Sequence, residues 1–363
     1  MVSTFIAFTI GIITIAILGN LFLIFVIIRG NTITKMRISP VQLLLLHTAV
    51  VDISFAIFSL GTELFIMFNR PHLPGPSWVC PVLKFIEIIP LYLSPMLLVA
   101  IAYDRYMAIC KPMANFRSNK YHRPNKMAII SWVIAIILSL PQLHVWEITN
   151  QGCLTREYFR HQFMQIYVLY FNLFVWLIPS ILATYFYFHV CKSVWLSKKV
   201  VLDGVNGLTK SSLKNNREKT LGNVYRDEEN ETLVYVKRIR STSNVIKQQD
   251  NEFGRKRIHT VRLTLTIIAC NFFLWTPYCL FNVVQAIAPD LVSHYKGIAN
   301  YLGVLGNLNS CVNPWIFILF NPKNVKNALM SICPWYLSKK RKTVLIKGEV
   351  NYCDDIRISN SAF

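Results

Sequence analysis

Polar residues able to bind an ion stand inside otherwise apolar segments of the chain. Asp52 is the clearest, because it lies in the middle of the apolar segment 40–69. An ionisable group buried in hydrocarbon costs at least ~2.5 kcal/mol and so needs a structural or functional reason. Other apolar segments offer it amides and hydroxyls, from Asn20, Ser94, Asn309, Ser310 and Asn313. Such a set either only fixes helix packing or forms a cation site and switch; a carboxylate among neutral oxygens favours the second.

A second charged group closes the apolar segment 81–103, where Asp104, Arg105 and Tyr106 follow one another. An isolated Asp-Arg pair at a helix end is usually a surface ion pair of small energetic value. In a helix, however, the rise from Cys80 to Arg105 is about 37 Å, enough to cross a membrane. Arg105 would therefore reach the cytoplasmic face of the membrane, and this position indicates a function more strongly than the ion pair does.

The elements that must hold these residues are membrane-spanning helices. The chain has 363 residues, of which 53% are hydrophobic and only 15% charged. Each of seven apolar stretches reaches the roughly 20 residues that a helix needs to cross hydrocarbon. They lie at 1–28, 40–69, 81–103, 127–146, 164–195, 261–287 and 297–320. The sequence predicts an all-α membrane protein, with its termini on opposite sides of the membrane.

The distribution of charge orients these spans. A net charge of +20 would suggest nucleic acid as a partner of a soluble protein. With the N-terminus outside, the cytoplasmic segments hold every Lys and Arg except Arg70, Lys84, Arg156, Arg160 and Lys296. The positive-inside rule and attraction to anionic membrane lipid explain the excess, so no nucleic-acid partner is expected. We expect a multi-pass plasma-membrane protein with a cytoplasmic C-terminus.

Two of the nine cysteines differ from the others by their place in this topology. Cys80 at the outer start of the third span and Cys153 in the second outer loop both face the oxidising side. A disulfide between them would tie that loop over the mouth of the helix bundle. We expect the other cysteines to be reduced, small apolar residues.

The domain organisation follows from changes in composition. Residues 1–320 are expected to form the seven-span domain, interrupted by a disordered third cytoplasmic loop at about 197–257. Residues 321–334 have the amphipathic pattern of a helix lying on the membrane surface, and 335–363 form a cytoplasmic tail. Cys333 is a candidate for lipidation, although an unmodified cysteine next to the membrane fits almost as well.

Four prolines interrupt the apolar segments, at Pro141, Pro179, Pro277 and Pro314. A proline inside a helix frees a backbone carbonyl and kinks the helix. One such proline is commonly only a packing feature. Four in one set of spans, with Trp275 two residues before Pro277, favour helices that pivot.

These motifs together resemble the rhodopsin-like (class A) G protein-coupled receptors over essentially the whole chain. The resemblance implies a seven-transmembrane helix bundle with a short amphipathic eighth helix, and a receptor rather than an enzyme. The motifs occur in the order and spacing of that family: Gly19-Asn20, Asp52, Cys80, Asp104-Arg105-Tyr106, Trp132, Pro179, Phe273-Leu274-Trp275-Thr276-Pro277 and Asn313-Pro314.

Finer features are similar to the vasopressin/oxytocin receptor group, in its invertebrate-like form. They lie at 76–80, 139–142 and 308–316, the last run being the most specific. The resemblance implies a disulfide-cyclised, amidated neuropeptide as ligand. It places ligand contacts at Glu63, Lys84, Glu87, Gln142, Trp275 and Asn282.

Several pocket positions depart from the Gln that related receptors mostly carry: Ser59, Glu63, Glu87 and Asn282. The acidic replacements would suit a peptide with additional basic residues. Glu87 also lies three residues after Lys84, so a local ion pair that never touches ligand explains it equally well. Both interpretations stay open at this point.

The resemblance also implies a signalling route. Asp104, Arg105 and Tyr106 would couple to a heterotrimeric G protein, with Asn20, Asp52, Ser94, Asn309, Ser310, Asn313 and Pro314 as the switch and sodium network. No cofactor is expected beyond an allosteric Na⁺ at Asp52, and arrestin and receptor kinases are candidate partners. Phe317 replaces the family's Tyr, and Asn271 replaces an aromatic residue, so both positions affect the expected switch.

Other functions fit the sequence less well. Receptors for gonadotropin-releasing or cardioactive peptides share much of this core and remain the main alternative. Biogenic-amine receptors carry Asp where this chain has Glu87, and opsins carry the retinal Lys where it has Asn307. A transporter or channel is disfavoured because the sequence shows neither inverted repeats nor a charged relay.

Overall fold

The computed structural model describes residues 2–35, 37–70, 72–112, 122–196, 229–292 and 297–331. Within these ranges, seven helices are long and apolar enough to cross a membrane. They run over Thr4–Thr34, Pro40–Phe68, Val79–Cys110, Arg123–Val145, Met164–Leu196, Ile258–Ile287 and Tyr301–Phe320. The seven predicted spans are thus confirmed, and the third is longer than its apolar stretch, so that it contains Arg105.

The chain divides into two compact units. The first comprises Met1–Ser94, Trp132–His161 and Asn300–Phe363, and the second comprises Pro95–Ser131 and Gln162–Ala299. Helix α4 (Val79–Cys110) contributes its first half to one unit and its second half to the other.

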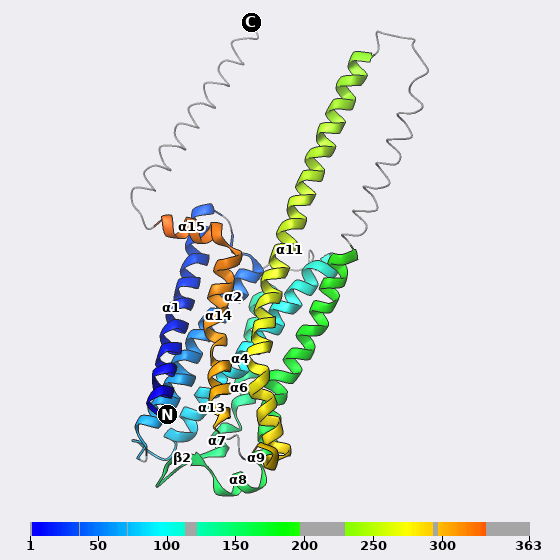
Figure 1. The fold of residues 1–363 in the computed structure, drawn as a ribbon. Helices are drawn as coiled ribbons and strands as arrows, with labels where there is room; N and C mark the ends of the chain where they lie inside the picture. Colours follow the sequence, from blue (N-terminus) through cyan, green and yellow to red (C-terminus); the bar gives the residue numbers. More distant parts are fainter. Residues whose placement is uncertain are drawn as a thin grey trace. The chain divides into compact units, whose positions relative to one another are not determined.

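The first unit is organised around α1 (Val2–Thr34), which packs against α2 (Pro40–Ser54), α14 (Asn309–Phe320) and α15 (Pro322–Met330) (Figure 1). Its other elements are α3 (Gly61–Phe68), α6 (His122–Ser139) from Trp132 onward, α7 (Gln142–Val145), nearly all of α8 (Glu157–Gln162) and nearly all of α13 (Ile298–Asn307). A capping box starts α2, where the Ser39 side chain accepts from the Gln42 amide and the Gln42 side chain accepts from the Ser39 amide.

A turn of π-helix, η1 (Phe55–Leu60), continues α2 directly after the residues around Asp52. One extra residue per turn rotates all following side chains about the helix axis, and such turns are frequent at functional sites. The buried side chains Phe55, Ala56 and Leu60 form a core with Ile12 and Ala16 of α1.

The predicted amphipathic segment 321–334 contains α15, a helix with Pro322 at its start and Ala328 buried. Figure 1 shows α15 beside the C-terminal end of α1. The guanidinium Nε of Arg29 donates to the hydroxyl of Ser331 at 3.1 Å, which ties the two segments together. Residues 332–363, including Cys333, lie outside the described part of the chain.

A small hairpin belongs to the same unit. Strands β1 (Trp146–Thr149) and β2 (Gly152–Thr155) pair antiparallel, with Ile148 opposite Cys153. Gly152 has φ of 110°, a left-handed conformation that a residue without Cβ adopts at no steric cost. The hairpin is therefore a local structure fixed by its turn.

The second unit contains the rest of α4, the first part of α6 up to Ser131, α9 (Met164–Asn172), the π-helical turn η2 (Leu173–Leu177), helical residues 178–196, α11 (Glu229–Ile287) and α12 (Pro289–Val292). Its core is built from apolar side chains of spans three, five and six. They are Ala102, Ile109, Ala183, Tyr187, Val190 and Val261.

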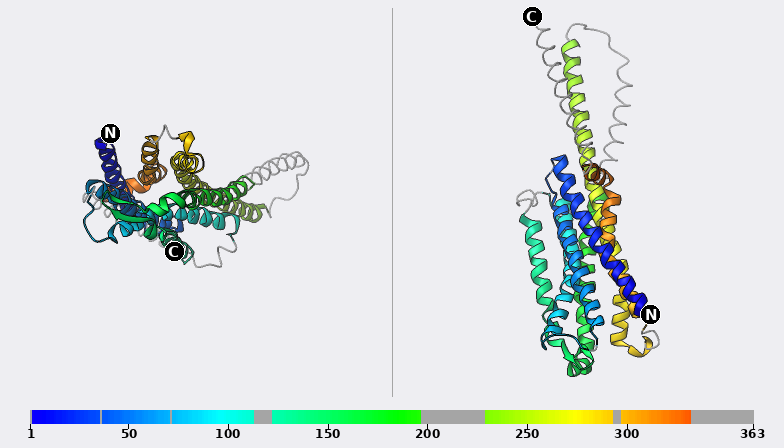
Figure 2. Two further views of the ribbon diagram at one scale, coloured as in Figure 1. Left: turned by 90° about the horizontal axis from the view of Figure 1, so that it is seen from below. Right: turned by 90° about the vertical axis from the view of Figure 1, so that its left-hand side faces the viewer.

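Helix α11 differs from the composition-based expectation of disorder at 197–257. It begins at Glu229 and continues without interruption through the sixth span, as the single long ribbon of Figure 2 shows. The physical reason is that 229–257 is rich in Glu, Lys, Arg and Gln and contains no proline, so a helix propagates from the span into it. Residues 197–228 lie outside the described ranges.

Candidate functional site

The structure places the polar residues predicted around Asp52 in the first unit and buries all of them except Ser94, which is half-buried. Asp52 is only 2% exposed, and its Oδ2 accepts a hydrogen bond from Asn313 Nδ2 at 2.8 Å. The Nδ2 of Asn20 donates to the carbonyls of Ala16 and Ser310, both at 2.9 Å. Spans one, two and seven are thus joined through polar contacts. We call Asn20, Asp52, Ser94, Asn309, Ser310 and Asn313 the Asp52 cluster.

Several oxygen atoms of the Asp52 cluster have no hydrogen-bond partner among the described residues. They are Asn20 Oδ1, Asn309 Oδ1 and Ser94 Oγ, and all three are inaccessible to solvent. The Ser310 hydroxyl, in contrast, donates to the Asn307 carbonyl at 2.9 Å. Free neutral oxygens, and a carboxylate that bonds to no cationic side chain among the described residues, are donor types that a hard cation prefers. The residues present therefore fit a small cation such as Na⁺.

Close packing of α1 against α14 positions this cluster. A Cβ on Gly19 would meet the ring of Pro314 at 3.4 Å, at the tight end of van der Waals contact. Glycine at this position lets Asn20, the next residue, reach the backbone of Ser310. The Gly19-Asn20 and Asn313-Pro314 motifs therefore form one packing unit.

A second polar cluster of the first unit contains the three charged residues expected in the ligand pocket. Lys84 Nζ donates to Glu87 Oε2 at 2.8 Å, and both side chains are largely buried. Ser59, on η1, donates to the backbone carbonyl of Glu87. Glu63, one turn further on, interacts electrostatically with Lys84. The local pair that the spacing allowed is formed, whereas ligand contact by these residues stays a prediction.

Trp146 on β1 completes this second cluster, and the sequence-based prediction missed it. The Lys84 ammonium lies 4.9 Å from the centre of the Trp146 ring, a cation-π distance. The Trp146 indole also donates to the side chain of buried Gln142. A Trp four residues after Gln142 was the available signal. We call Glu63, Lys84, Glu87, Gln142 and Trp146 the Lys84 cluster.

The disulfide predicted between Cys80 and Cys153 is confirmed and holds the hairpin in place. The Cα atoms are 5.6 Å apart, and both residues are buried with Ile66 and Leu73. Because Cys153 lies on β2, the bond fixes the hairpin that carries Trp146 to the start of α4. The disulfide thus supports the Lys84 cluster.

The remaining predicted ligand residues belong to the second unit. Trp275 and Asn282 lie on α11 on either side of Pro277, and both are partly buried. The Trp275 ring contacts the Tyr278 ring edge to face, with centroids 6.0 Å apart. Pro277 removes one backbone hydrogen bond inside α11, which gives the helix a point of bending near Trp275.

The Asp104-Arg105-Tyr106 motif lies in the last turns of α4. The guanidinium of Arg105 is held by the neighbouring carboxylate, with Nε 3.2 Å from Asp104 Oδ2. The Tyr106 ring packs against Phe186, with centroids 5.5 Å apart. Arg105 is thus paired locally with Asp104.

Comparison with known proteins identifies the class. Residues 19–317 match the sequence profile described as "7 transmembrane receptor (rhodopsin family)". The chain therefore belongs to the rhodopsin family of seven-transmembrane receptors, which are multi-pass membrane proteins and not enzymes.

Individual relatives show to which receptors within this family the chain is similar. Nematocin receptor 2 of Caenorhabditis elegans is 48% identical over 318 residues, covering 87% of this chain and 76% of that protein. Nematocin receptor 1 of the same organism is 39% identical, covering 89% and 79%. Cephalotocin receptor 1 of Octopus vulgaris is 28% identical, covering 85% and 75%. The resemblance to invertebrate receptors of the vasopressin/oxytocin group is confirmed.

Proposed function

We propose that this chain is a plasma-membrane receptor for a vasopressin/oxytocin-like neuropeptide, which it reports to a heterotrimeric G protein. The observation that carries the proposal is the 48% identity to a nematocin receptor across nearly nine-tenths of the chain. The receptor would have its N-terminus outside, since Lys and Arg concentrate on the other side of the spans.

The Lys84 cluster supports a peptide as the ligand. It combines an ammonium, two carboxylates and an indole, under a hairpin tied by a disulfide. A peptide offers backbone carbonyls to Lys84 and basic groups to Glu63 and Glu87. Gln142, Trp275 and Asn282 complete the proposed contacts. Peptide binding would open the Lys84–Glu87 pair or use the charge that the pair leaves uncompensated.

In this proposal the signal passes through three features that can change: the bend of α11, the partners of Asp52 and the ion pair of Arg105. Peptide contact at Trp275 would bias the bend of α11 at Pro277, and Asp52 and Asn313 would exchange partners. Arg105 would then leave Asp104 and face the G protein. Na⁺ bound at the Asp52 cluster would stabilise the inactive arrangement, because the cation requires the cluster oxygens to converge. Receptor kinases and arrestin would act on the cytoplasmic segments.

Signalling in transfected cells tests this function. Cells expressing the chain with an N-terminal epitope are exposed to nematocin, other vasopressin/oxytocin-like peptides, and gonadotropin-releasing and cardioactive peptides. Calcium and cAMP are recorded together. We expect potent responses to the first group alone, and surface staining of intact cells. Responses only to another peptide class would overturn the ligand, and responses to none of the peptides despite surface expression would overturn the whole assignment.

Glu87→Gln separates ligand contact from local pairing. It removes the charge but keeps the side-chain shape, so Lys84 loses its ion pair with Glu87 and keeps Glu63 as an anionic neighbour. A direct role predicts a loss of agonist potency of about tenfold, as expected for one charge-assisted hydrogen bond. Unchanged potency would show that Glu87 serves only the pair with Lys84. Binding of the same peptide to Arg105→Ala, with signalling lost, is the control for intact folding.

A further inference from the structure

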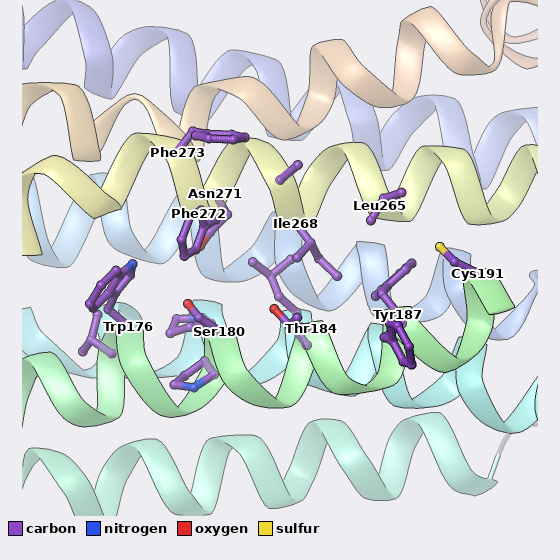
Figure 3. Close-up of a pocket in the computed structure, with 17 residues that line it drawn as sticks. Trp176, Ser180, Thr184, Tyr187, Cys191, Leu265, Ile268, Asn271, Phe272 and Phe273 are labelled. Carbon is purple, nitrogen blue, oxygen red and sulfur yellow. The ribbon is translucent and has the colours of Figure 1, made fainter.

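The second unit contains a cavity of about 450 Å³. It lies between spans five and six, and Pro95 and Leu98 of α4 also line it. Figure 3 shows its lining side chains following the two helices from Trp176 at one end to Cys191 at the other. In helical geometry, the segment from Ser180 to Cys191 alone rises by roughly 16 Å. The cavity is therefore long and narrow.

Hydrogen bonds join spans five and six at the two ends of this cavity. At one end, Trp176 Nε1 donates to Thr276 Oγ1 at 3.0 Å, and the indole stacks on Phe272. At the other end, the buried Tyr187 hydroxyl donates to Thr264. Trp176 lies on the π-helical turn η2, which rotates it out of regular helical register. The two contacts fix the distance between spans five and six at both ends of the cavity.

The cavity exists where the sequence has replaced an aromatic ring by an amide. Asn271 stands one turn before Trp275, at the position where the sequence departs from the aromatic residue of related receptors. Its side chain lines the cavity and makes no hydrogen bond to any described residue. Ser180 and Thr184 also line the cavity, and their hydroxyls make no hydrogen bond to any described residue. An amide without a partner at membrane depth is costly, so a ligand that bonds to it is favoured.

The chemistry of the walls defines the ligand. None of the residues lining the cavity is charged, and most are apolar. Asn271 and Ser180 lie toward one end, and Leu265 and Cys191 toward the other (Figure 3). Phe273, one of the lining residues, is 72% exposed, which leaves the cavity reachable from the surface of the second unit. A charged headgroup would enter without a counter-charge and pay the full desolvation cost.

We propose that this cavity binds a neutral single-chain lipid alcohol, whose hydroxyl bonds to Asn271 and Ser180 and whose chain runs toward Leu265 and Cys191. Such a ligand fills the space between two hydrogen-bonded contacts. It therefore stabilises the present spacing of spans five and six. The site is independent of the peptide-binding function proposed above.

Photo-crosslinking of the full chain in lipid nanodiscs tests the site. The probe is hexadecanol carrying a photoreactive diazirine on its chain, with plain hexadecanol as competitor and the corresponding fatty acid as charged control probe. Labelled peptides are mapped by mass spectrometry. We expect saturable labelling of spans five and six that plain hexadecanol displaces and that the charged probe reproduces at most weakly. The proposal would be overturned if plain hexadecanol did not reduce the labelling, or if the fatty-acid probe labelled the same spans equally well.

Two substitutions at Asn271 and a matched control locate the binding. Asn271→Phe fills the cavity and should lower cavity labelling by roughly tenfold. Asn271→Leu keeps the volume, removes the amide and should weaken competition about fivefold. Ile181→Phe adds the same ring on an exposed face of span five and should label like the unmodified chain. Equal labelling of Asn271→Leu and the unmodified chain overturns the role of the amide, even where Asn271→Phe does not fold.

Discussion

The Asp52 cluster and the Lys84 cluster both place carboxylates inside membrane-spanning helices, but they neutralise them differently. Glu87 has an ammonium at 2.8 Å, and that ammonium in turn contacts the Trp146 ring. Among the described residues, the Asp52 carboxylate accepts a hydrogen bond only from the amide of Asn313, and three other oxygens of its cluster have no partner. In the Lys84 cluster an ammonium pairs with Glu87 and also acts on Glu63, whereas no cationic side chain among the described residues bonds to Asp52.

This difference assigns different roles to the two clusters. A carboxylate that already has an ammonium as partner, as Glu87 has, is stable without a ligand, and a peptide must compete with that contact. A set with excess acceptors gains stability from a cation, and so responds to whatever changes the cation's affinity. The first arrangement suits selective recognition and the second suits a switch.

The largest expected effect comes from breaking the disulfide that supports the Lys84 cluster. Cys153→Ser should lower the free energy of unfolding by about 2–5 kcal/mol, because Cys80 and Cys153 close a long loop. Thermal unfolding in detergent measures it. Cys191→Ser, at a free exposed cysteine, is the matched control. The double variant with Cys80→Ser should be no less stable than either single one; additive losses would contradict a shared bond.

The missing positive charge of the Asp52 cluster can be tested directly. Replacing choline by Na⁺ in the buffer should stabilise the receptor by roughly 1–3 kcal/mol, as for a ligand well above its Kd. Asp52→Asn should abolish this stabilisation, since the carboxylate is gone. Glu87→Gln should retain it, because the Lys84 cluster has its own cation. Equal Na⁺ responses of the two variants would remove the distinction between the clusters.

A smaller effect is expected from the packing that positions Asn20. Gly19→Val forces a side chain against Pro314 and should cost about 1–3 kcal/mol of stability, with a weaker Na⁺ response. Gly11→Val, on the same helix with nothing within 4 Å of its Cβ, should leave both unchanged. Thermal unfolding with and without Na⁺ measures both variants. Similar losses for the two would assign the effect to β-branching and not to contact.

The smallest expected effect separates the two contacts of Trp146. Trp146→Phe keeps a ring over Lys84 but removes the hydrogen bond to buried Gln142, and should cost about 1 kcal/mol. Trp146→Ala removes both and should cost more. Agonist dissociation and thermal unfolding are the measurements. If the two variants behave alike, the ring contact with Lys84 contributes nothing.

Much of the architecture could be predicted from the sequence because the bilayer imposes it. Apolar length defines the seven spans, and Cys80 and Cys153 stand on one side of them by topology alone. Asp52, Asn20 and Asn313 were recognised because polar groups at membrane depth are rare. The helix over 229–257 was not predicted, since composition does not show where a long helix stops propagating.

The contacts that give these residues their chemistry could not be read from the sequence. Trp146 contacts Lys84, which is far away in the sequence, only because the hairpin is tied to α4. Its contact with Gln142 depends on how the chain turns between α7 and β1. The cavity beside Asn271 depends on how the π-helical turn η2 rotates Trp176. The sequence by itself determined the spans, their order and their polar residues, because hydrophobicity acts locally. Tertiary structure decided which carboxylate is paired, which is open to a cation and where space remains, because those depend on packing between helices.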